Sequence, residues 1–328
     1  MDHKATGRII KGVGGLYQVL VSASDEPSLT GKLLPCRARG KFRHSNITPL
    51  VGDTVELLFN DRTIKALEEG GLAGNKSASE IMISEITDRK NALIRPPLAN
   101  LDYIFISMAS ASPTPILSTV DKLISIAEFN KIEPVIIIGK SELDPDSAEK
   151  IKEIYEKAGF KVFIISVFEN EGIDELSEFI KVNLAGKITA FAGASGVGKS
   201  SLMNRLFPDL SLDTGEISQK IERGKNTTRH VELFRHECYD GDGYIADTPG
   251  FSMLDFAHFD FFKKDDLPLT MREFHDYIGL CRYTKCSHTK EEGCAIIEAV
   301  KRGDISKSRH DSFVEIYNVL KDKTDWKN

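Results

Sequence analysis

The chain has 328 residues, of which 41% are hydrophobic and 28% charged, so it has the composition of a soluble globular protein with two or three domains. This composition excludes wholesale disorder and a disulfide-stapled miniprotein, and apolar runs of only four residues, such as 135–138, exclude a transmembrane helix. The net charge of −6 argues against a general nucleic-acid coat, but the acidity lies in residues 91–262, which leaves both ends free to contact a polyanion.

Short apolar runs separated by turn residues fill the first 90 residues. Val55, Leu57 and Phe59 recur at every second position, which is the period of a half-buried strand. We therefore expect a small antiparallel barrel with strands over 8–11, 16–21, 32–38, 54–59 and 81–86. Residues 61–79 are polar and contain glycine, which predicts a loop, and residues 91–100 with Pro96-Pro97 predict an extended linker.

From residue 101 the chain alternates between apolar strands and amphipathic helices. Strands are expected over 101–108, 134–138, 162–166 and 188–192. Helices are expected around 118–127 behind a Ser118/Asp121 capping pair, after Asp144-Pro145, and over 174–182. This alternation predicts an α/β domain with a parallel sheet that is covered on both faces.

A glycine-rich segment between strand 188–192 and a helix matches the pattern G-x-x-x-x-G-K-[ST]. Its residues, with the serine that follows, are Gly193, Ala194, Ser195, Gly196, Val197, Gly198, Lys199, Ser200 and Ser201. In such a loop the backbone N–H groups wrap a diphosphate, Lys199 reaches the terminal phosphates and the Ser200 hydroxyl ligates Mg²⁺. An ordinary glycine turn is the alternative, against which the flanking strand and helix argue.

A second phosphate-contacting element is predicted at Asp247-Thr248-Pro249-Gly250, after a short apolar strand. Asp247 is expected to hold Mg²⁺ through water, and the Gly250 N–H to sense a γ-phosphate. The basic segment 223–229 has the composition of a phosphate-contacting loop or of a solvated surface loop, and we favour its Thr228 as a Mg²⁺ ligand. The expected catalytic residues are Lys199, Thr228, Asp247 and Gly250.

Guanine-nucleotide switches read the base with an N-K-x-D tetrapeptide at the end of a parallel strand, where the carboxylate accepts from guanine N1 and N2. The candidate here is Gly139-Lys140-Ser141-Glu142, which precedes the phosphate loop, so the order of these elements is permuted. Relative to the pattern, Gly139 lacks the Asn side chain and Glu142 carries its carboxylate one methylene further out.

Three of the five cysteines fall within one short segment with the pattern Cys281-x4-Cys286-x-His288-x5-Cys294. Three thiolates and one imidazole close a tetrahedral Zn²⁺ shell and leave no position for a catalytic water. We therefore predict a structural zinc site that stabilises a small C-terminal domain. Buried cysteines beside a surface histidine are the alternative.

Together these motifs resemble the circularly permuted, ribosome-small-subunit-dependent GTPases of the RsgA (YjeQ) family. GASGVGKSS, RGKNTTR, DTPGF and the upstream element 139–142 carry the resemblance, which extends to residues 36–53 and 89–102. It implies an OB-fold β-barrel over 1–88, an α/β P-loop GTPase domain with a mostly parallel sheet over 89–262, and a zinc-binding helical domain over 263–328. It also implies GTP and GDP with Mg²⁺, one structural Zn²⁺, and the small ribosomal subunit with its rRNA as partner in late maturation.

Two features bear on how such a protein would work. Phe251 follows D-x-x-G where many GTPases have a water-orienting Gln, and Asn226 stands where the family commonly has His, so intrinsic hydrolysis is expected to be slow. Arg37, Arg39, Lys41 and Arg43 recur at every second position, so on an extended strand they would share one face. In an OB barrel this row is expected to contact rRNA phosphates, although a charged edge strand has the same pattern.

Two other functions stay open at this point. The altered element 139–142 favours a P-loop ATPase or small-molecule kinase, whereas the absent Gln and His favour a nucleotide-gated RNA-binding module with little hydrolysis. Two appended domains suited to a large partner favour the GTPase acting on the small ribosomal subunit. The N-terminus lacks the apolar segment of a secretory signal, so we expect a cytoplasmic protein without a membrane partner. We also expect a monomer.

Overall fold

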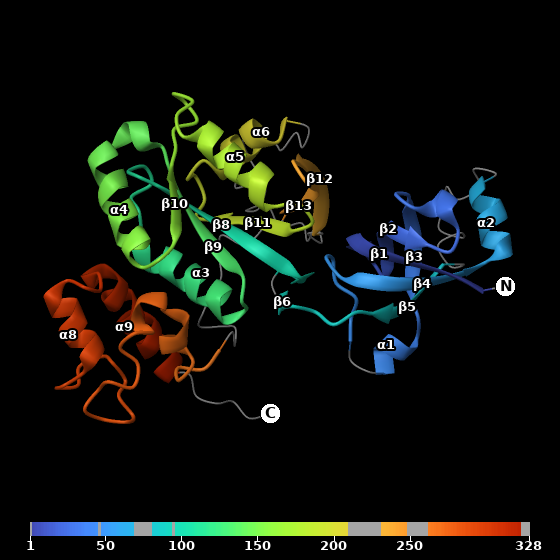
Figure 1. Ribbon diagram of the computed structural model, residues 1–328. Coiled ribbons are helices and arrows are strands. Elements are labelled where there is room, and N and C mark those ends of the chain that lie inside the picture. The colour runs from blue at the N-terminus through green and yellow to red at the C-terminus, as the bar shows by residue number, and fades with distance from the viewer. Residues whose placement is uncertain are drawn as a thin grey trace, which may run out of the picture.

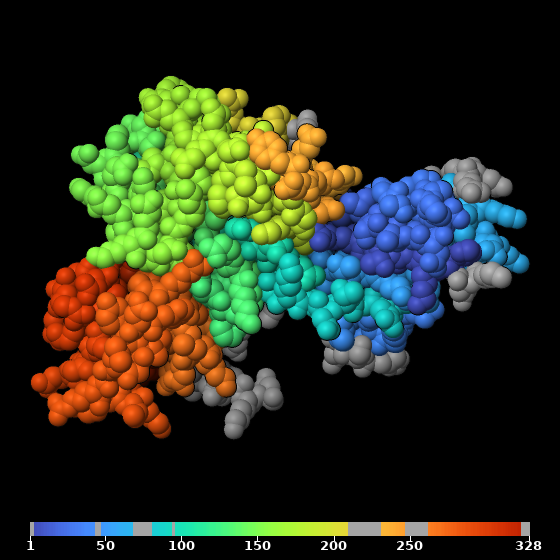
Figure 2. Space-filling view, in the orientation of Figure 1, coloured from blue at the N-terminus to red at the C-terminus, as the bar shows by residue number. Residues whose placement is uncertain are grey.

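A computed structural model of the chain describes residues 2–44, 47–68, 81–93, 96–208, 231–247 and 262–322. Three parts follow one another along the chain: a barrel, a central sheet with helices on both faces, and a small helical part (Figure 1). Figure 2 shows the barrel and the helical part against different sides of the central part. Within the described residues, no helix has both the length and the apolar character that crossing a membrane requires.

Five strands close the N-terminal part into a barrel. They are β1 (Asp2–Val13), β2 (Leu16–Ser24), β3 (Leu33–Ala38), β4 (Thr54–Asn60) and β5 (Met82–Ile86), with the short helix η1 (Pro27–Leu29) after β2. The strand order is β1-β2-β3-β5-β4, and pairing of β1 with β4 closes the barrel. Val55, Leu57 and Phe59 are at most 3% exposed, as their alternation predicted. The predicted OB-type barrel is confirmed, with one parallel pair, β3 with β5.

The loop predicted over 61–79 begins instead as a helix, α2 (Asp61–Glu68). Asn60 caps this helix, because its side-chain oxygen accepts hydrogen bonds from the backbone N–H groups of Arg62 and Thr63 at 3.0 Å. Ile64 and Leu67 then pack against the barrel core. Two apolar residues in a polar stretch were too few to predict this helix from the sequence. Residues 69–80, the rest of the predicted loop, lie outside the described part of the chain.

The segment expected to be an extended linker contains two short strands that pair with each other. β6 (Ala92–Leu93) pairs with β7 (Leu98–Ala99). The fully buried Ala99 donates its N–H to Val51 O of the barrel part at 2.9 Å. The Asn91 side chain bonds both the N–H and the C=O of Leu101. The segment therefore ties the barrel to the first strand of the central sheet.

The central sheet has the strand order β10-β9-β8-β11-β13-β12. These strands are β8 (Leu101–Ala109), β9 (Glu133–Gly139), β10 (Lys161–Ile164), β11 (Ile188–Gly193), β12 (Glu232–Cys238) and β13 (Gly241–Asp247). All neighbours are parallel except β12, which is antiparallel to β13. The four expected strands are confirmed, and β12 is a strand that the sequence pattern did not reveal. β12 also pairs with β1 at Glu232 and Lys11, so the barrel strands continue this sheet.

Helices cover both faces of the central sheet, as predicted. α3 (Leu117–Phe129) and α4 (Pro145–Lys157) cover one face, and α5 (Ile173–Asn183) and α6 (Lys199–Leu206) the other. Successive side chains of β8 point to opposite faces of the sheet and are buried on both. Ile104 and Ile106 belong to the core under α3 and α4, whereas Phe105 belongs to the core under α5 and α6. α4 begins at the predicted Asp144-Pro145, where Asp144 accepts from the Ser147 N–H.

The C-terminal part contains the short turns η5 (Leu267–Thr270) and η6 (Arg272–Phe274) and the helices α8 (Ala295–Arg302) and α9 (Lys307–Asp322). α9 packs on α3 (Figure 1), and at this junction the fully buried Arg309 of α9 bonds Asp121 of α3. The predicted Ser118/Asp121 capping pair is therefore wrong. α3 starts after Ile116 without a side-chain cap, because Asp121 faces inward toward Arg309.

Candidate nucleotide and metal sites

The predicted phosphate loop turns between β11 and α6. Gly193, Gly196 and Gly198 have φ angles of 136°, 80° and 97°, which residues with a side chain rarely adopt. A Cβ on Gly193 would lie 2.1 Å from Ser107 O, so only glycine lets β11 approach β8 this closely. Lys199 begins α6, and the unpaired N–H groups of its first turn, which also holds Ser200 and Ser201, favour an anion at the loop.

The Lys199 side chain folds back over the phosphate loop. Its Nζ donates to Gly193 O and to Ala194 O, at 2.7 Å each. Burial lowers the pKa of this ammonium group. A phosphate oxygen is a stronger acceptor for an ammonium than a neutral carbonyl, so Lys199 is held where a bound phosphate would take over its hydrogen bonds.

A cavity of about 420 Å³ lies beside the phosphate loop. Its lining comes from β8 and β9, from the residues that follow β9 and β10, from the phosphate loop and from the start of α6. It comprises Ser107, Ile137, Gly139, Lys140, Glu142, Leu143, Ile165, Val167, Phe168, Val197, Gly198, Ser201 and Leu202. The structure therefore brings the predicted base-reading element together with the phosphate loop. Open α/β sheets bind their ligands at this carboxyl edge of the strands.

Hydrogen bonds from the end of β8 fix the shape of the base-reading element. The Ser110 N–H donates to Gly139 O at 2.9 Å, and Ser110 Oγ donates to Lys140 O at 2.7 Å. Lys140 has a left-handed φ of 56°, and its Nζ donates to Ser112 O at 2.5 Å. Lys140 is thus tied to the segment that leads from β8 into α3.

Glu142 supplies the polar group that a base would meet in this cavity. It lies in the short turn η3 (Ser141–Leu143), and its Oε2 atom is buried without a hydrogen-bond partner among the described residues. A buried carboxylate oxygen without a donor is costly. Hydrogen-bond donors of a bound base, such as guanine N1 and N2, would remove that cost if they reached this oxygen, and the role of Glu142 in reading guanine stays a prediction.

Val167 and Phe168 also line the cavity, although sequence reasoning did not single them out. They follow β10, just as Lys140 follows β9 and Ala194 follows β11. Because the carboxyl ends of parallel strands meet at one edge of a sheet, their position after the expected strand 162–166 was the signal that would have identified them.

The other predicted nucleotide contacts are described only in part. Asp247 is the last residue of β13, two strands from β8 across the sheet. Thr228, Gly250 and the basic segment 223–229 lie outside the described residues. The roles assigned to these residues at Mg²⁺ and at the γ-phosphate stay predictions.

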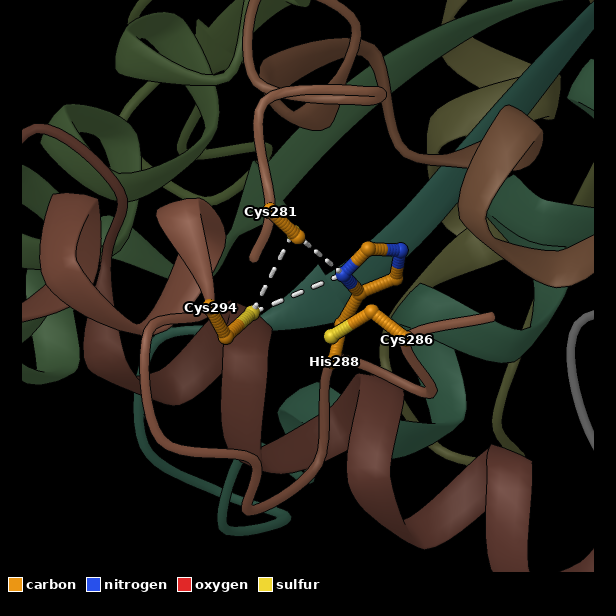
Figure 3. Close-up of side chains that lie close together, drawn as sticks. All are labelled: Cys281, Cys286, His288 and Cys294. Atoms are coloured by element: carbon orange, nitrogen blue, oxygen red, sulfur yellow. Dashed lines mark hydrogen bonds between the residues drawn. The ribbon is translucent and has the colours of Figure 1, made fainter. Parts of the chain in front are cut away.

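Cys281, Cys286, His288 and Cys294 point toward one another (Figure 3), and their ligand atoms all lie within 4.8 Å of one another. The Sγ atoms of Cys281 and Cys294 are 3.8 Å apart, and each is 3.5 Å from His288 Nδ1. Two Zn–S bonds at a tetrahedral angle would put the sulfurs roughly 3.8 Å apart. His310 of α9 donates to His288 O at 2.8 Å and so holds the ligand loop. The sequence-predicted cluster therefore has the geometry of a metal site.

The basic stretch 37–43 does not form one continuous strand, so the predicted row on a single face is wrong. β3 ends at Ala38, and the short helix α1 (Lys41–His44) follows. Phe42 of this helix packs into the barrel core and is 8% exposed. Arg37 and Arg39 are exposed, Lys41 lies on α1, and the Arg43 side chain is outside the described part. Contact of these four residues with RNA stays a prediction.

Comparisons with known proteins match both the barrel and the central part. The family described as RsgA GTPase matches residues 86–257, and the RsgA N-terminal domain family matches residues 6–64. A curated protein of Agathobacter rectalis named "Small ribosomal subunit biogenesis GTPase RsgA" is 41% identical over 97% of this chain and 99% of its own length. The Bacillus pumilus protein of the same name is 40% identical over 97% of this chain and 98% of its own.

Two solved structures share the fold over nearly the whole chain. YjeQ from Thermotoga maritima is 30% identical with a TM-score of 0.75, covering 98% of this chain and 100% of that one. YloQ, described as a circularly permuted GTPase, is 33% identical with a TM-score of 0.72, covering 98% of this chain and 96% of that one.

Proposed function

Because this chain belongs to the RsgA family of GTPases and is a GTP hydrolase, we propose that it uses GTP hydrolysis to assist late maturation of the small ribosomal subunit. The observation that carries the nucleotide assignment is the cavity of about 420 Å³ that Glu142 lines together with Val197 and Gly198 of the phosphate loop. A kinase or ATPase for a small substrate has no need of a buried acceptor for guanine donors, and the comparisons do not support that alternative.

We propose a protein partner for each part of the nucleotide. The phosphate-loop amides and Lys199 bind the phosphates, and Glu142 accepts from the guanine N1 and N2 donors. Ser200 and Thr228 are the proposed protein ligands of Mg²⁺, with Asp247 holding it through water and the Gly250 N–H meeting the γ-phosphate. When bound, Mg²⁺ neutralises charge that develops on the phosphates.

We assign a structural Zn²⁺ to Cys281, Cys286, His288 and Cys294. Three sulfurs and one imidazole nitrogen complete a tetrahedral shell, so this metal would hold the C-terminal part together rather than activate water. Residues 275–294, which carry the ligands, lie outside the helices and strands of the structure, so a bound metal would cross-link a segment that has no regular ladder of backbone hydrogen bonds.

The proposed partner is the small ribosomal subunit, contacted through its rRNA. The names of the relatives connect those proteins with biogenesis of this subunit. The proposed functional units are the barrel over 1–88, the GTPase domain over 89–262 and the zinc domain over 263–328. The exposed Arg37 and Arg39, with Lys41 and Arg43, would contact rRNA phosphates at the barrel. We infer that the protein acts as a monomer in the cytoplasm, where small subunits are assembled.

Steady-state hydrolysis tests this proposal. GTP and ATP turnover are measured with the purified full chain, alone and with isolated small ribosomal subunits, beside the Lys199→Met variant as the inactive control. We expect slow GTP turnover that the subunits raise many-fold, with little ATP turnover. Glu142→Ala should narrow the preference for GTP over ATP and leave the subunit effect in place. Equal use of ATP by the natural chain, or no response to subunits, would contradict the proposal.

A further inference from the structure

Phe168 is the most exposed large apolar side chain among the described residues, with 88% of its surface open to solvent. A phenylalanine in this state loses the favourable free energy that burial of its ring would provide. Phe168 lines the nucleotide cavity together with Glu142, whose Oε2 atom is buried without a hydrogen-bond partner among the described residues. The cavity therefore combines one unsatisfied acceptor with one unpacked aromatic ring.

The backbone around Phe168 is fixed although its ring is not packed. The N–H and C=O groups of Ser166 bond those of Glu171, and Ser166 Oγ accepts from the Glu169 N–H at 3.0 Å. Asn170 Oδ1 accepts from Arg205 Nε at 3.0 Å and from Arg205 Nη2 at 2.6 Å. Since Arg205 belongs to α6, the loop that carries Phe168 is tied to the helix that begins at the phosphate loop. Because the backbone is already fixed, stacking of the Phe168 ring on a ligand would cost little conformational entropy.

Leu143 is the second exposed apolar residue of the same cavity, at 53% exposure, and it directly follows Glu142. An aromatic ring and an aliphatic side chain beside a carboxylate suit a flat, aromatic ligand that has hydrogen-bond donors on its edge. A purine base has such a shape, and bases stack on exposed aromatic side chains.

We propose that Phe168 stacks on the face of the guanine base and supplies binding free energy, while Glu142 supplies selectivity. The inference rests on the proposed binding of a guanine nucleotide in this cavity. Gly139 offers no side chain to the ligand, so the ring of Phe168 provides contact area that the base-reading tetrapeptide lacks. Stacking has little base preference, because every base has an aromatic face. Phe168 therefore contributes to the affinity for any purine nucleotide, and Glu142 determines how much more tightly guanine nucleotides bind than others.

Binding titrations on the full chain separate the two roles. GDP and inosine diphosphate, which lacks the 2-amino donor, are titrated against the natural chain and against Phe168→Ala, Phe168→Tyr and Glu142→Ala. Phe168→Ala should weaken both nucleotides by the same factor, roughly 5- to 150-fold, the effect of losing one base stack. Phe168→Tyr should restore binding of both. Glu142→Ala should instead reduce the ratio between the two affinities.

Leu269→Ala is the matched control, because Leu269 is 59% exposed but lies in η5, outside the cavity. A Phe168→Trp variant adds a direct readout, since GDP should change the emission of an indole on which guanine stacks. If Phe168→Ala binds GDP as tightly as the Leu269→Ala control does, the stacking role is wrong. In that case, tighter binding of GDP than of inosine diphosphate by the natural chain would still support the proposed function. If the natural chain does not distinguish the two nucleotides and Glu142→Ala changes nothing, the proposed guanine site itself is wrong.

Discussion

Replacing Arg309 by Met should destabilise the protein more than any exposed charge substitution. The Arg309 side chain is fully buried between α9 and α3, where its Nη1 bonds Asp121 Oδ1 at 2.5 Å and its Nε bonds Glu273 Oε1 at 2.7 Å. Tyr155 of α4 donates to the same Asp121 oxygen at 3.0 Å. Burial alone would lower the pKa of Arg309, but Asp121 and Glu273 outweigh it and raise that pKa, so the guanidinium is charged.

The expected cost follows from what the substitution leaves behind. Methionine fills much of the volume of the side chain but pairs with neither carboxylate, and the side chains of Asp121 and Glu273 are only 1% and 6% exposed. Removing one partner of a buried ion pair costs about 3–5 kcal/mol, because the remaining charges stay desolvated and unpaired. By contrast, the side chains of the Arg302–Asp304 pair are 56% and 45% exposed, so solvent screens this pair and Arg302→Met should cost far less than Arg309→Met.

Urea unfolding followed by far-ultraviolet circular dichroism measures both free energies of unfolding. In Arg309→Met the unpaired carboxyls bind protons more tightly in the folded state than in the unfolded chain. The stability of this variant should therefore rise as the pH is lowered from about 7 to about 5. If Arg309→Met costs no more than Arg302→Met, or if its deficit does not shrink on acidification, the buried network does not hold the C-terminal part to the GTPase domain.

Three further predictions address the phosphate loop, the metal and the barrel. Gly193→Ala should abolish nucleotide binding, because its Cβ would lie 2.1 Å from a backbone oxygen at positive φ; equilibrium dialysis with GDP measures this, and unchanged binding would contradict the geometry. A chelator assay should release one Zn²⁺ per chain and lower the melting temperature, whereas Cys281→Ser should hold no metal and Cys36→Ser, at a buried cysteine outside the cluster, should hold it fully. Arg37→Ala should weaken binding to the small subunit and reduce its salt dependence by the share of about one phosphate contact; an unchanged salt slope would remove Arg37 from the interface.

Local patterns in the sequence were sufficient to predict the barrel, the central sheet and the metal ligands. Alternation placed Phe59 inside the barrel, and the spacing of Cys281 and Cys294 required no knowledge of the fold to indicate a common ligand. The errors arose where a distant partner decides the outcome. Asp121 resembles a capping residue in the local sequence, but Arg309, which lies far along the chain, pairs with it in the folded protein. The basic row from Arg37 to Arg43 resembles one face of a strand until the chain turns into α1, where the Phe42 ring packs into the barrel core. Phe168 belongs to no local motif, and only the common edge of the parallel strands brings it to the nucleotide cavity.

The connections of the two flanking parts suggest how a large partner could control hydrolysis. The barrel meets the central sheet through β12, where Lys11 Nζ bonds Glu232 at 2.5 Å, and Glu232 follows the basic segment 223–229 closely in the sequence. The C-terminal part packs on α3, and the segment before α3 accepts the Lys140 side chain through Ser112 O. The barrel is thus joined to β12, which follows the segment expected to contact the phosphates. The C-terminal part is joined to α3, which follows the segment that holds the Lys140 side chain. A partner that held both parts at once would constrain both sides of the nucleotide site, which one domain bound alone would not do. Hydrolysis stimulated by the small subunit should therefore require the barrel and the C-terminal part on the same chain.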